Sequence, residues 1–413
     1  MTVGIITNSY PPNLNGVAVC VKNLENELIN KGINVVIVTP KVPGVEYSDN
    51  VYQLPSAPAP TAMSKDLRLT FTYNDKKVIQ FLKDNNVSVL HSHDTIMGAQ
   101  DTIMIGQQLK IPVIHTYHTY LESYGYFKLI GYKIFIRNYS RFICDYSDGV
   151  VVLSTKMNKY LLSIGVKSKM YQLPNVYLEK SIDGTKLPKP QYFIEENLLE
   201  HTFNILMFGR LAKEKNIINS IEIIRPLFIR YPKLRLVILG DGPMYAEIKE
   251  YLDENELNKR VLLYGAFNYT DLSVIANESK LYFNTSVTEV LPTTLIEAAS
   301  FSLPLVTVDD SAYEYLLKDG VNGYFSPISL LEEKLETLIL DEKLRAKMSL
   351  NSKQSFFEYQ AVNYGKKYIE MYEDVVNNYI HKNISLKLLN SFQTKLKTFV
   401  ESIDLNLFDY WRK

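Results

Sequence analysis

Short apolar runs alternate with helix-length amphipathic segments along the first half of the chain. VGIIT at 3–7 is β-branched and apolar, and GVAVCVKNLENELINKG after it has apolar residues at helical spacing before Lys31 and Gly32. Further strands are expected at 34–39, 87–91, 111–116, 149–154 and 169–174. This alternation predicts a parallel α/β sheet.

The same alternation begins again after a polar stretch without periodicity, from about Val176 to His201. Six more strands are expected at 203–209, 234–240, 260–265, 280–286, 303–308 and 322–325. We therefore predict two doubly wound, Rossmann-like domains in this α/β chain. Their predicted limits are 1–178 and 201–375, with a linker at 179–200 and a helical tail at 376–413. Ligands bind beyond the carboxyl ends of strands in such sheets, so a cleft between two facing domains is expected.

Length and composition agree with this division and exclude several classes of protein. The 413 residues exceed the length at which single cores stop growing, roughly 250–300 residues. Because 45 basic residues balance 45 acidic ones, no overall field recruits nucleic acid, and an anion site has to be local. The two cysteines argue against a disulfide scaffold. With no signal-peptide pattern at the start and no long apolar window, a cytoplasmic location is expected.

A loop rich in proline and asparagine follows the first expected strand. It reads NSYPPNLNGVA and places Gly16 where a helix opens. A glycine there lets backbone amides approach an anion, which the helix dipole also favours. The alternative is a loop glycine that serves only turn geometry.

The second half opens with a strand that runs into a cationic loop, FGRLAKEKN. Gly209 ends the strand, Arg210 follows, and Lys215 stands five residues further on. Two cations at the carboxyl end of a strand suit a diphosphate, because arginine donates from a planar fork and lysine acts as a point charge. The alternative is a solvated loop whose charges face water.

Two acids flank an expected helix start in TSVTEVLPTTLIEAASFSLPLV, residues 285–306. Glu289 lies in the loop, and Glu297 falls about two turns into a helix that starts at Pro292. Both would lie beside the amides of Thr293 and Thr294, which have no partner inside the helix. The alternative is that the acids only interact favourably with the helix dipole, which stabilises a helix by about 0.3–1 kcal/mol for each acid near its start. This alternative explains one of the two glutamates. The full set matches the acceptors and donors that a nucleotide sugar requires.

Five motifs in this order resemble those of the family 4 retaining glycosyltransferases, which have the GT-B fold. They are NGVA after the first strand, HTYHTYLE (115–122), FGRLAKEKN, LGDGP, and the pair of acids in EVLPTTLIE. The similarity extends to about residue 375. HTYHT together with RFICDYSDGVVVLS is most similar to bacterial enzymes that move glucose onto diacylglycerol.

The resemblance implies roles for the matching residues. Arg210 and Lys215 would hold the donor diphosphate, Glu297 would accept from the ribose hydroxyls, and Glu289 would lie near the transferred sugar. His118 would contact that sugar from the first domain, whereas His115 is expected to be packed or capping. The implied catalytic set is His118, Glu289, Arg210 and Lys215, and the substrate-binding set is Gly16, Gly209, Arg210, Lys215, Glu289, Pro292, Thr293, Thr294 and Glu297.

Two segments depart from the family pattern. LPTT replaces the usual glycine between the acids, and SFSLP replaces the small-Gly-x-Pro segment after the second acid. Pro292 also removes one amide donor at the helix start. These changes bear on the geometry of the phosphate site and on the identity of the sugar.

No metal and no cofactor is expected beside the donor. His91 and His93 have no third ligand at a suitable spacing and no acidic cluster nearby. In the family, fixed cations and helix amides take the leaving charge, and domain closure would exclude water.

The predicted function is therefore a hexosyltransferase that moves a hexose, glucose being expected, from a UDP-linked donor to a membrane lipid such as diacylglycerol. Retention of configuration is implied by the family alone. The alternatives are a transferase for a cell-wall, capsular or protein acceptor, a sugar-nucleotide epimerase, and a non-catalytic partner of another transferase.

A peripheral position on the inner face of the cell membrane is a further hypothesis. In segment 126–146, four aromatic residues at helical spacing run beside the basic residues Lys133, Arg137 and Arg141. This pattern fits either an anionic membrane surface or a core face beside a solvated face. In the tail, apolar residues from Leu389 to Ile403 share one helical stripe that would pack on the first domain, bind a protein partner, or lie at the membrane through Trp411.

Overall fold

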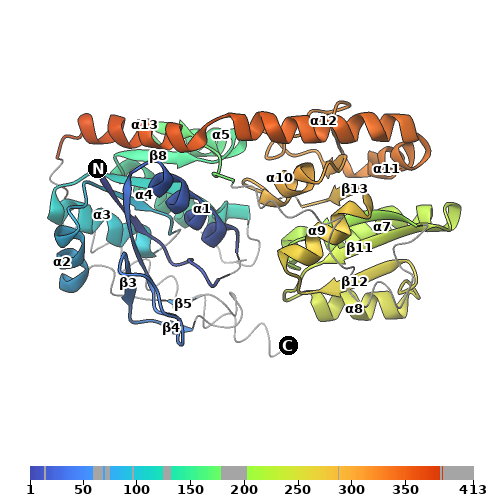
Figure 1. The fold of residues 1–413 in the computed structure, drawn as a ribbon, viewed down its shortest axis with the longest axis horizontal. Helices are drawn as coiled ribbons and strands as arrows, with labels where there is room; N and C mark the ends of the chain where they lie inside the picture. The colour runs from blue at the N-terminus through green and yellow to red at the C-terminus, as the bar shows by residue number, and fades with distance from the viewer. Residues whose placement is uncertain are drawn as a thin grey trace. The chain divides into compact units, whose positions relative to one another are not determined.

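The computed structural model describes residues 1–13, 15–58, 68–69, 75–94, 97–123, 132–177, 202–286, 288–381 and 384. The chain forms two compact units, one of Met1–Leu178 with Asn363–Lys413 and one of Glu179–Val362 (Figure 1). Helix α13 (Tyr364–Asn377) therefore belongs to the first unit, whereas the sequence-based division had placed residues up to 375 in the second domain. The expected linker and the apolar stripe of the tail lie outside the described residues.

The first unit is built on a seven-stranded parallel sheet with the order β3-β2-β1-β6-β7-β8-β9. All six strands expected from the sequence form, and β3 and the short antiparallel pair β4 and β5 are additional. The strands are β1 (Thr2–Ile6), β2 (Asn34–Pro40), β3 (Val51–Leu54), β4 (Ala57–Pro58), β5 (Arg68–Leu69), β6 (Val89–Ser92), β7 (Val113–Tyr117), β8 (Gly149–Val152) and β9 (Met170–Gln172). The helices, besides α13, are α1 (Gly16–Asn30), α2 (Lys76–Asp84), α3 (Met97–Leu109), α4 (Tyr132–Tyr146) and α5 (Thr155–Ser163), with a 3-10 turn η1 at Leu121–Ser123.

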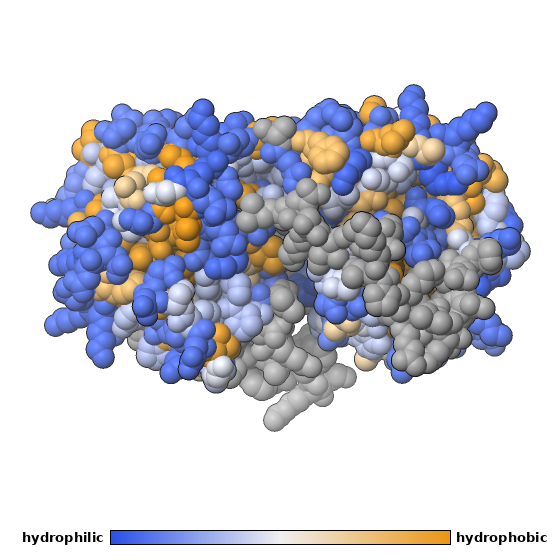
Figure 2. Space-filling view, viewed as in Figure 1, coloured by the Kyte–Doolittle hydropathy of each residue, from blue (hydrophilic) through white to orange (hydrophobic). Residues whose placement is uncertain are grey.

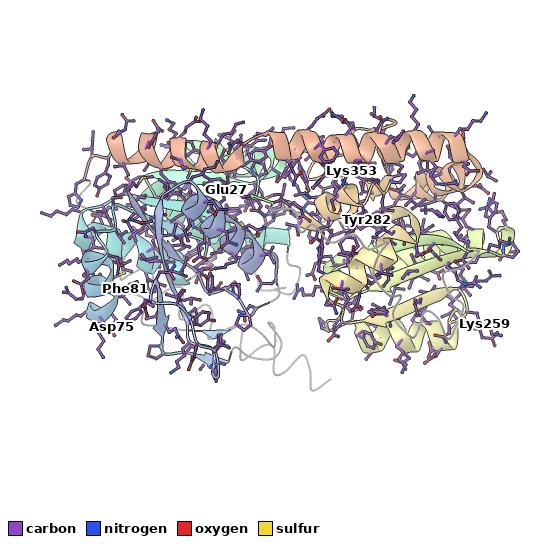
Figure 3. The ribbon with its side chains drawn as sticks, viewed as in Figure 1. Glu27, Asp75, Phe81, Lys259, Tyr282 and Lys353 are labelled. Carbon is purple, nitrogen blue, oxygen red and sulfur yellow. The ribbon has the colours of Figure 1, made fainter. Side chains whose placement is uncertain are left out.

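Local sequence signals explain where these helices begin. Asn15 caps α1 by accepting hydrogen bonds from the amides of Val17 and Ala18. Asp75 caps α2 in the same way, and the ring of Phe81 on this helix lies 5.2 Å from that of Tyr52 (Figure 3). Strands β1, β2 and β8 are buried on both faces, which is why they read as continuous apolar runs.

The second unit repeats this architecture with a six-stranded parallel sheet of order β12-β11-β10-β13-β14-β15. The strands are β10 (Phe203–Phe208), β11 (Leu234–Leu239), β12 (Val261–Gly265), β13 (Ser279–Asn284), β14 (Leu305–Val308) and β15 (Gly323–Ser326). The helices are α7 (Ile217–Arg230), α8 (Tyr245–Glu254), α9 (Tyr269–Asn277), α10 (Thr293–Ser300), α11 (Leu331–Leu340) and α12 (Glu342–Ala361). Two 3-10 turns complete it, η3 (Lys213–Lys215) and η4 (Ile328–Leu330). This strand order is that of a doubly wound dinucleotide-binding sheet, so the expected fold class is confirmed.

Helix α12 holds the carboxyl end of α10 in place. Lys353 donates to the carbonyl of Ser300 at 2.7 Å, and Ser349 donates to that of Ser302 at 2.7 Å (Figure 3 labels Lys353). Ser302 has a left-handed backbone with φ 61°, at the place where the family pattern has glycine. Its amide bonds to Ala299, and the next amide bonds to Ala298 at 3.1 Å, which is a Schellman motif closed by serine.

Each sheet has a switch point, where the direction of winding reverses. In the first sheet it lies between β1 and β6, and in the second between β10 and β13. The loops that leave the carboxyl ends of these neighbouring strands are the places where ligands bind in such sheets. Ligand sites are therefore expected at the loops after β1 and β6, and at those after β10 and β13.

The aromatic stripe of α4 packs into the core of the first unit. Tyr139 and Phe142 are buried, and Phe135 and Tyr146 pack against the same cluster. The alternative of a core face beside a solvated face is therefore correct for 132–146, and the aromatic residues do not form a membrane-facing surface. Lys133 and the other basic residues of this helix stay exposed. Within the described residues, no helix has both the length and the apolar character needed to cross a membrane.

Candidate functional site

The loop after β10 is shaped by backbone contacts with the loop after β11. Gly240 comes so close to this loop that an added Cβ would lie 1.9 Å from the carbonyl oxygen of Gly209. The amide of Leu211 bonds to the carbonyl of Asp241 at 2.9 Å. Backbone contacts alone therefore hold the two loops together, because the glycines allow the two backbones to approach closely.

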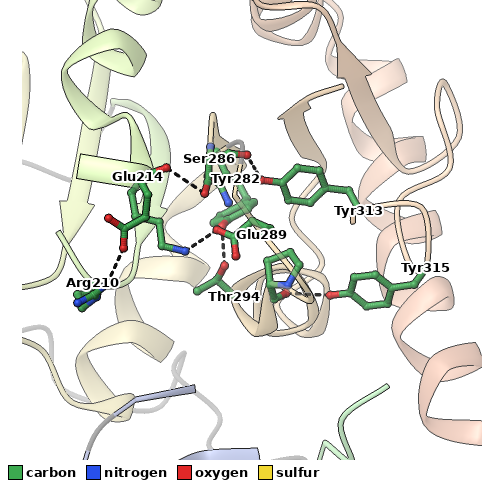
Figure 4. A network of polar contacts seen from close by, with 11 residues as sticks. Arg210, Glu214, Tyr282, Ser286, Glu289, Thr294, Tyr313 and Tyr315 are labelled. Atoms are coloured by element: carbon green, nitrogen blue, oxygen red, sulfur yellow. Dashed lines mark hydrogen bonds and ion pairs between the residues drawn. The ribbon is translucent and has the colours of Figure 1, made fainter. Parts of the chain in front are cut away.

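Arg210 and Lys215 lie on this loop, and each is paired with a carboxylate. An Nη atom of Arg210 lies 2.5 Å from Oε1 of Glu214, and the ammonium of Lys215 bonds to Oε1 of Glu289 (Figure 4). The carboxylates are largely buried, since the side chain of Glu214 is 9% exposed and that of Glu289 is 10% exposed. The alternative of a solvated loop is therefore wrong for Lys215, whereas Lys213 is exposed to solvent.

The loop after β13 is held against the same turn. Ser286 donates to the carbonyl of Glu214 at 3.3 Å, and Thr285 donates to that of Asn216 at 3.2 Å. Tyr313 donates to the carbonyl of Ser286 at 2.8 Å from the far side (Figure 4). These bonds bring the loop that carries Glu289 to the cationic loop, although 74 residues separate Lys215 from Glu289 in sequence.

The helix start that was predicted at Pro292 is present one residue later. Pro292 is the N-cap of α10, and Thr293 and Thr294 are its first two residues. The hydroxyl of Thr294 bonds to that of Tyr282 on β13 at 2.8 Å, and an added Cβ on Gly209 would lie 3.6 Å from Thr294 (Figure 4). The amides of this first turn therefore lie beside the loop after β10.

Glu297 is half-buried on α10, its fifth residue. It is therefore about one and a half turns into the helix and not two, because the helix starts at Thr293. Burial raises the pKa of Tyr282 and of Tyr313, so both phenols stay protonated and can donate. Sequence reasoning missed these tyrosines, since an aromatic residue in a buried strand carries no local sign of a polar role.

In the first unit, Gly16 opens α1 at the carboxyl end of β1. Asn15 already occupies the amides of Val17 and Ala18, so two of the first N–H groups of this helix are used for capping. Within the part of the chain that the structure describes, no atom apart from those of the two neighbouring residues and the backbone of α1 itself lies within 4 Å of a Cβ added at Gly16. Packing within this unit therefore gives no reason for glycine here.

His118 follows β7 directly and is half-buried. Its Nε2 lies 2.8 Å from Nδ1 of His93, which follows β6. Burial, followed by the charge effect of His115, lowers the pKa of His118 to about 3. His115 is 2% exposed inside β7, as expected for a packed histidine, and burial lowers its pKa to about 4.

The fold also brings Cys20 to these histidines, which the spacing in sequence did not show. Cys20, His93 and His118 offer donor atoms that all lie within 4.8 Å of one another. However, the 2.8 Å between the two histidine nitrogens is a hydrogen-bond distance. Two nitrogens at about 2.0–2.1 Å from one tetrahedral metal would lie farther apart than this, at roughly 3.3 Å. The geometry is therefore that of a hydrogen-bonded pair.

The described site residues of the second unit provide two cations, a helix start and three carboxylates, those of Glu214, Glu289 and Glu297, at one switch point. Such a set has the chemistry to exchange its internal carboxylates for the phosphates of a ligand. Fold and site together therefore define a doubly wound α/β protein whose second unit has the chemistry of an anion-binding site.

Comparisons with known families identify which enzyme class this is. Residues 14–177 match the model of Glycosyltransferase Family 4, and residues 189–355 match that of Glycosyl transferases group 1. The chain belongs to the family 4 glycosyltransferases and is a hexosyltransferase.

Three of the similar curated proteins have names that refer to a lipid. Alpha-monoglucosyldiacylglycerol synthase of Streptococcus pneumoniae is 26% identical, covering 93% of this chain and 88% of that protein. The synthase of the same name from Acholeplasma laidlawii is 23% identical, covering 91% and 98%. The phosphatidylinositol N-acetylglucosaminyltransferase of Homo sapiens has a subunit that is 23% identical, covering 82% and 68%.

Solved structures give the same fold. The pneumococcal O-GlcNAc transferase GtfA, solved with UDP and GlcNAc, aligns with a TM-score of 0.69 and 15% identity over 92% of this chain and 99% of that one. HepE of Anabaena, solved with UDP, aligns with a TM-score of 0.70 and 15% identity over 91% and 100%. The fold of the chain is thus GT-B.

Proposed function

We propose that this hexosyltransferase moves glucose from UDP-glucose to diacylglycerol, with retention of configuration, at the inner face of the cell membrane. Two of the relatives above are named as synthases of alpha-monoglucosyldiacylglycerol, and two similar structures contain UDP. The second candidate is transfer of N-acetylglucosamine to another lipid, because a third relative is named as a phosphatidylinositol N-acetylglucosaminyltransferase subunit.

One observation carries the proposal, the ion pair between Lys215 and Glu289 beside the start of α10. When the donor binds, its diphosphate takes the place of Glu289 on Lys215 and of Glu214 on Arg210. The displaced Glu289 then accepts hydrogen bonds from the hydroxyls of the sugar, while Glu297 accepts from the ribose. Positive charge already held in place stabilises the departing diphosphate as the anomeric carbon becomes cation-like.

No divalent metal is required in this scheme, because two side-chain cations and the first amides of α10 neutralise the diphosphate. His118 stays neutral and acts as a hydrogen-bonding group on the sugar, not as an acid, since burial keeps the pKa of His118 low. A chelator is expected to leave the initial rate unchanged. A rate that depends on added Mg²⁺ or Mn²⁺ would contradict this part of the scheme.

The membrane part of the proposal rests on the exposed side of α4. Lys133 and Arg141 are exposed there beside Ile134, whose side chain is 67% exposed. On the face drawn in Figure 2 most of the surface is hydrophilic, with apolar residues in scattered groups. Attraction of α4 to an anionic surface would come mainly from the charges of Lys133 and Arg141. We expect the protein to sediment with vesicles rich in anionic lipid at low salt, and less so after Lys133→Ala and Arg141→Ala.

The function is tested by incubating the pure protein with UDP-glucose, UDP-GlcNAc and other nucleotide sugars in the presence of a lipid extract. Mass spectrometry is expected to show a diacylglycerol carrying one hexose, formed only with UDP-glucose. A hexosaminyl lipid would favour the second candidate. Transfer to peptides or glycans without a lipid product would contradict the lipid acceptor.

A further inference from the structure

A continuous chain of hydrogen bonds leads from helix α13 to His118. The hydroxyl of Tyr372 lies 2.7 Å from Nδ1 of His91, and Nε2 of His93 lies 3.3 Å from the same nitrogen. Nδ1 of His93 lies 2.8 Å from Nε2 of His118. At the other side of the chain, Nε2 of His91 lies 2.7 Å from the hydroxyl of Thr116 on β7.

Three members of this chain are buried, His118 is half-buried, and the histidine rings are close together. His91 is 0% exposed, His93 is 1% and Tyr372 is 0%. The ring centroids of His91 and His93 lie 4.1 Å apart, and those of His93 and His118 lie 5.0 Å apart. Burial lowers the pKa of His91 and of His93 well below the usual range, so both rings are neutral.

Because the histidine rings are neutral, the hydrogen bonds between them all run in one direction, from donor to acceptor. A neutral imidazole has one N–H donor and one lone-pair acceptor, so the proton on one ring determines the proton on the next. Nδ1 of His91 carries either one lone pair or one proton, so its 2.7 Å contact with Tyr372 and its longer 3.3 Å contact with His93 share it. If this nitrogen accepts, Nε2 of His93 is the donor, Nδ1 of His93 accepts from Nε2–H of His118, and His118 keeps a lone pair on Nδ1. If the direction is reversed, Nε2 of His118 accepts and its Nδ1 carries the proton. Each direction therefore allows His118 only one tautomer, with the proton on Nε2 in the first and on Nδ1 in the second.

We propose that His93, supported by His91 and Tyr372, is a positioning residue that fixes the ring orientation and the tautomer of His118. This inference rests on the proposed function, in which His118 contacts the donor sugar. A histidine at the end of a strand could otherwise rotate about its χ angles and exchange tautomers, and a misplaced hydrogen bond in the transition state costs up to about 100-fold in rate. Metal-bound histidines are oriented by a second partner in the same way.

Tyr372 gives the chain a link to the carboxyl-terminal helix. Gly365 allows α13 to pack closely on α1, because a Cβ there would lie 2.3 Å from Glu27 (Figure 3 labels Glu27). Tyr368, one turn before Tyr372, donates to the carbonyl of Leu173 at 3.4 Å. Helix α13 thus completes the polar interior of the first unit, although it follows the second unit in sequence.

The experiment uses the full-length protein in a buffer with a chelator and compares three variants. His93→Leu removes both nitrogens, and His93→Asn keeps a group near the Nδ1 position that can bond to His118. His115→Gln is the matched control, a buried histidine on β7 outside the hydrogen-bonded chain. The chain has six histidines, so ¹⁵N-histidine labelling gives few enough signals to follow the ring nitrogens of His118 directly.

For the wild type we expect one protonated and one unprotonated nitrogen in His118, and for His93→Leu averaged shifts from exchanging tautomers. The kcat for UDP-glucose is expected to fall about 10-fold to 100-fold in His93→Leu with little change in KM. His93→Asn is expected to regain most of this loss, and His115→Gln to retain the wild-type rate.

Unchanged His118 shifts in His93→Leu, or equal loss of kcat in His93→Asn and His93→Leu, would overturn the positioning role. An inactive wild type would instead contradict the proposed function. The ¹⁵N measurement does not depend on turnover, so it decides the role of His93 in either case.

Discussion

The two units share a strand order, but the carboxyl edges of their sheets hold polar side chains in opposite ways. In the first unit, His91, His93 and His118 are neutral and bonded to each other. In the second, Lys215 and Glu289 are charged and paired. The side chains at the carboxyl edge of the first sheet, the neutral edge, are therefore held by hydrogen bonds between neutral rings. Those at the carboxyl edge of the second sheet, the charged edge, are held by ion pairs. The same strand order thus supports two kinds of polar site. It determines which loops are neighbours, but it does not determine which side chains those loops contain.

The largest expected effect comes from breaking the charged edge. Lys215→Ala is expected to lower turnover by about 100-fold to 1000-fold, since a preorganised donor to the leaving group is lost. Lys213→Ala on the same 3-10 turn is the matched control, because Lys213 is exposed. Steady-state release of UDP measures both. Equal rates for Lys215→Ala and the control would contradict the role of Lys215.

The neutral edge is expected to fail on acidification. His91, His93, His115 and His118 have lowered pKa values in the folded chain, so below about pH 6.5 the unfolded chain binds more protons than the folded one. Stability therefore falls as pH falls through this window, by up to about 1.4 kcal/mol per pH unit for each histidine that stays neutral. Asp101 has the opposite effect on stability. Burial, with a contribution from Asp94, raises its pKa to about 7, so below that pH the folded chain binds one proton that the unfolded chain takes up only at lower pH.

Amide exchange, corrected for the intrinsic effect of pH, tests the comparison within one sample. Peptides from β6 and β7 are expected to lose protection between pH 7 and pH 5, and peptides from β10 and β13 to keep it. Equal loss in both sheets would show that the histidines are not the cause.

A smaller effect is expected at the left-handed serine after α10. Ser302→Gly is expected to stabilise the second unit by about 1 kcal/mol. A left-handed backbone is less stable by roughly that amount for a residue with a Cβ than for glycine. Chemical denaturation measures it, with Ser300→Gly, inside the helix, as a control of opposite sign. A destabilised Ser302→Gly would mean that its contacts outweigh the strain.

The smallest effect is expected at the surface of the first unit. Lys169 and Asp374 form an ion pair at 2.6 Å that joins β9 to α13, with side chains 61% and 34% exposed. Lys169→Met is expected to lower stability only slightly, because water screens an exposed ion pair, and less still at high salt. Tyr372→Phe, which removes a buried hydroxyl, is expected to cost more, about 1–3 kcal/mol. The reverse order would mean that α13 is held mainly by surface charge.

Much of the fold was predictable because parallel strands buried on both faces give continuous apolar runs. All twelve strands expected from the sequence form, and the alternation of strands and helices predicted the two doubly wound parallel sheets, but not the order of their strands. Strand β3 was missed because VYQL is short and mixed in polarity. The aromatic stripe of α4 left two interpretations open, since periodicity identifies an apolar face and not the surface it packs against.

The sequence by itself determined that this chain has two doubly wound sheets, a cationic loop after β10 and a carboxylate beside a helix start after β13. Local periodicity and motif spacing are enough for this, because they depend on neighbours in sequence. Only the tertiary structure decided that Lys215 and Glu289 pair, that Ser302 closes α10, and that Tyr372 joins a row of histidines in the first unit. Those contacts depend on which strands become neighbours and where α13 packs, and burial then decides which groups keep their charge.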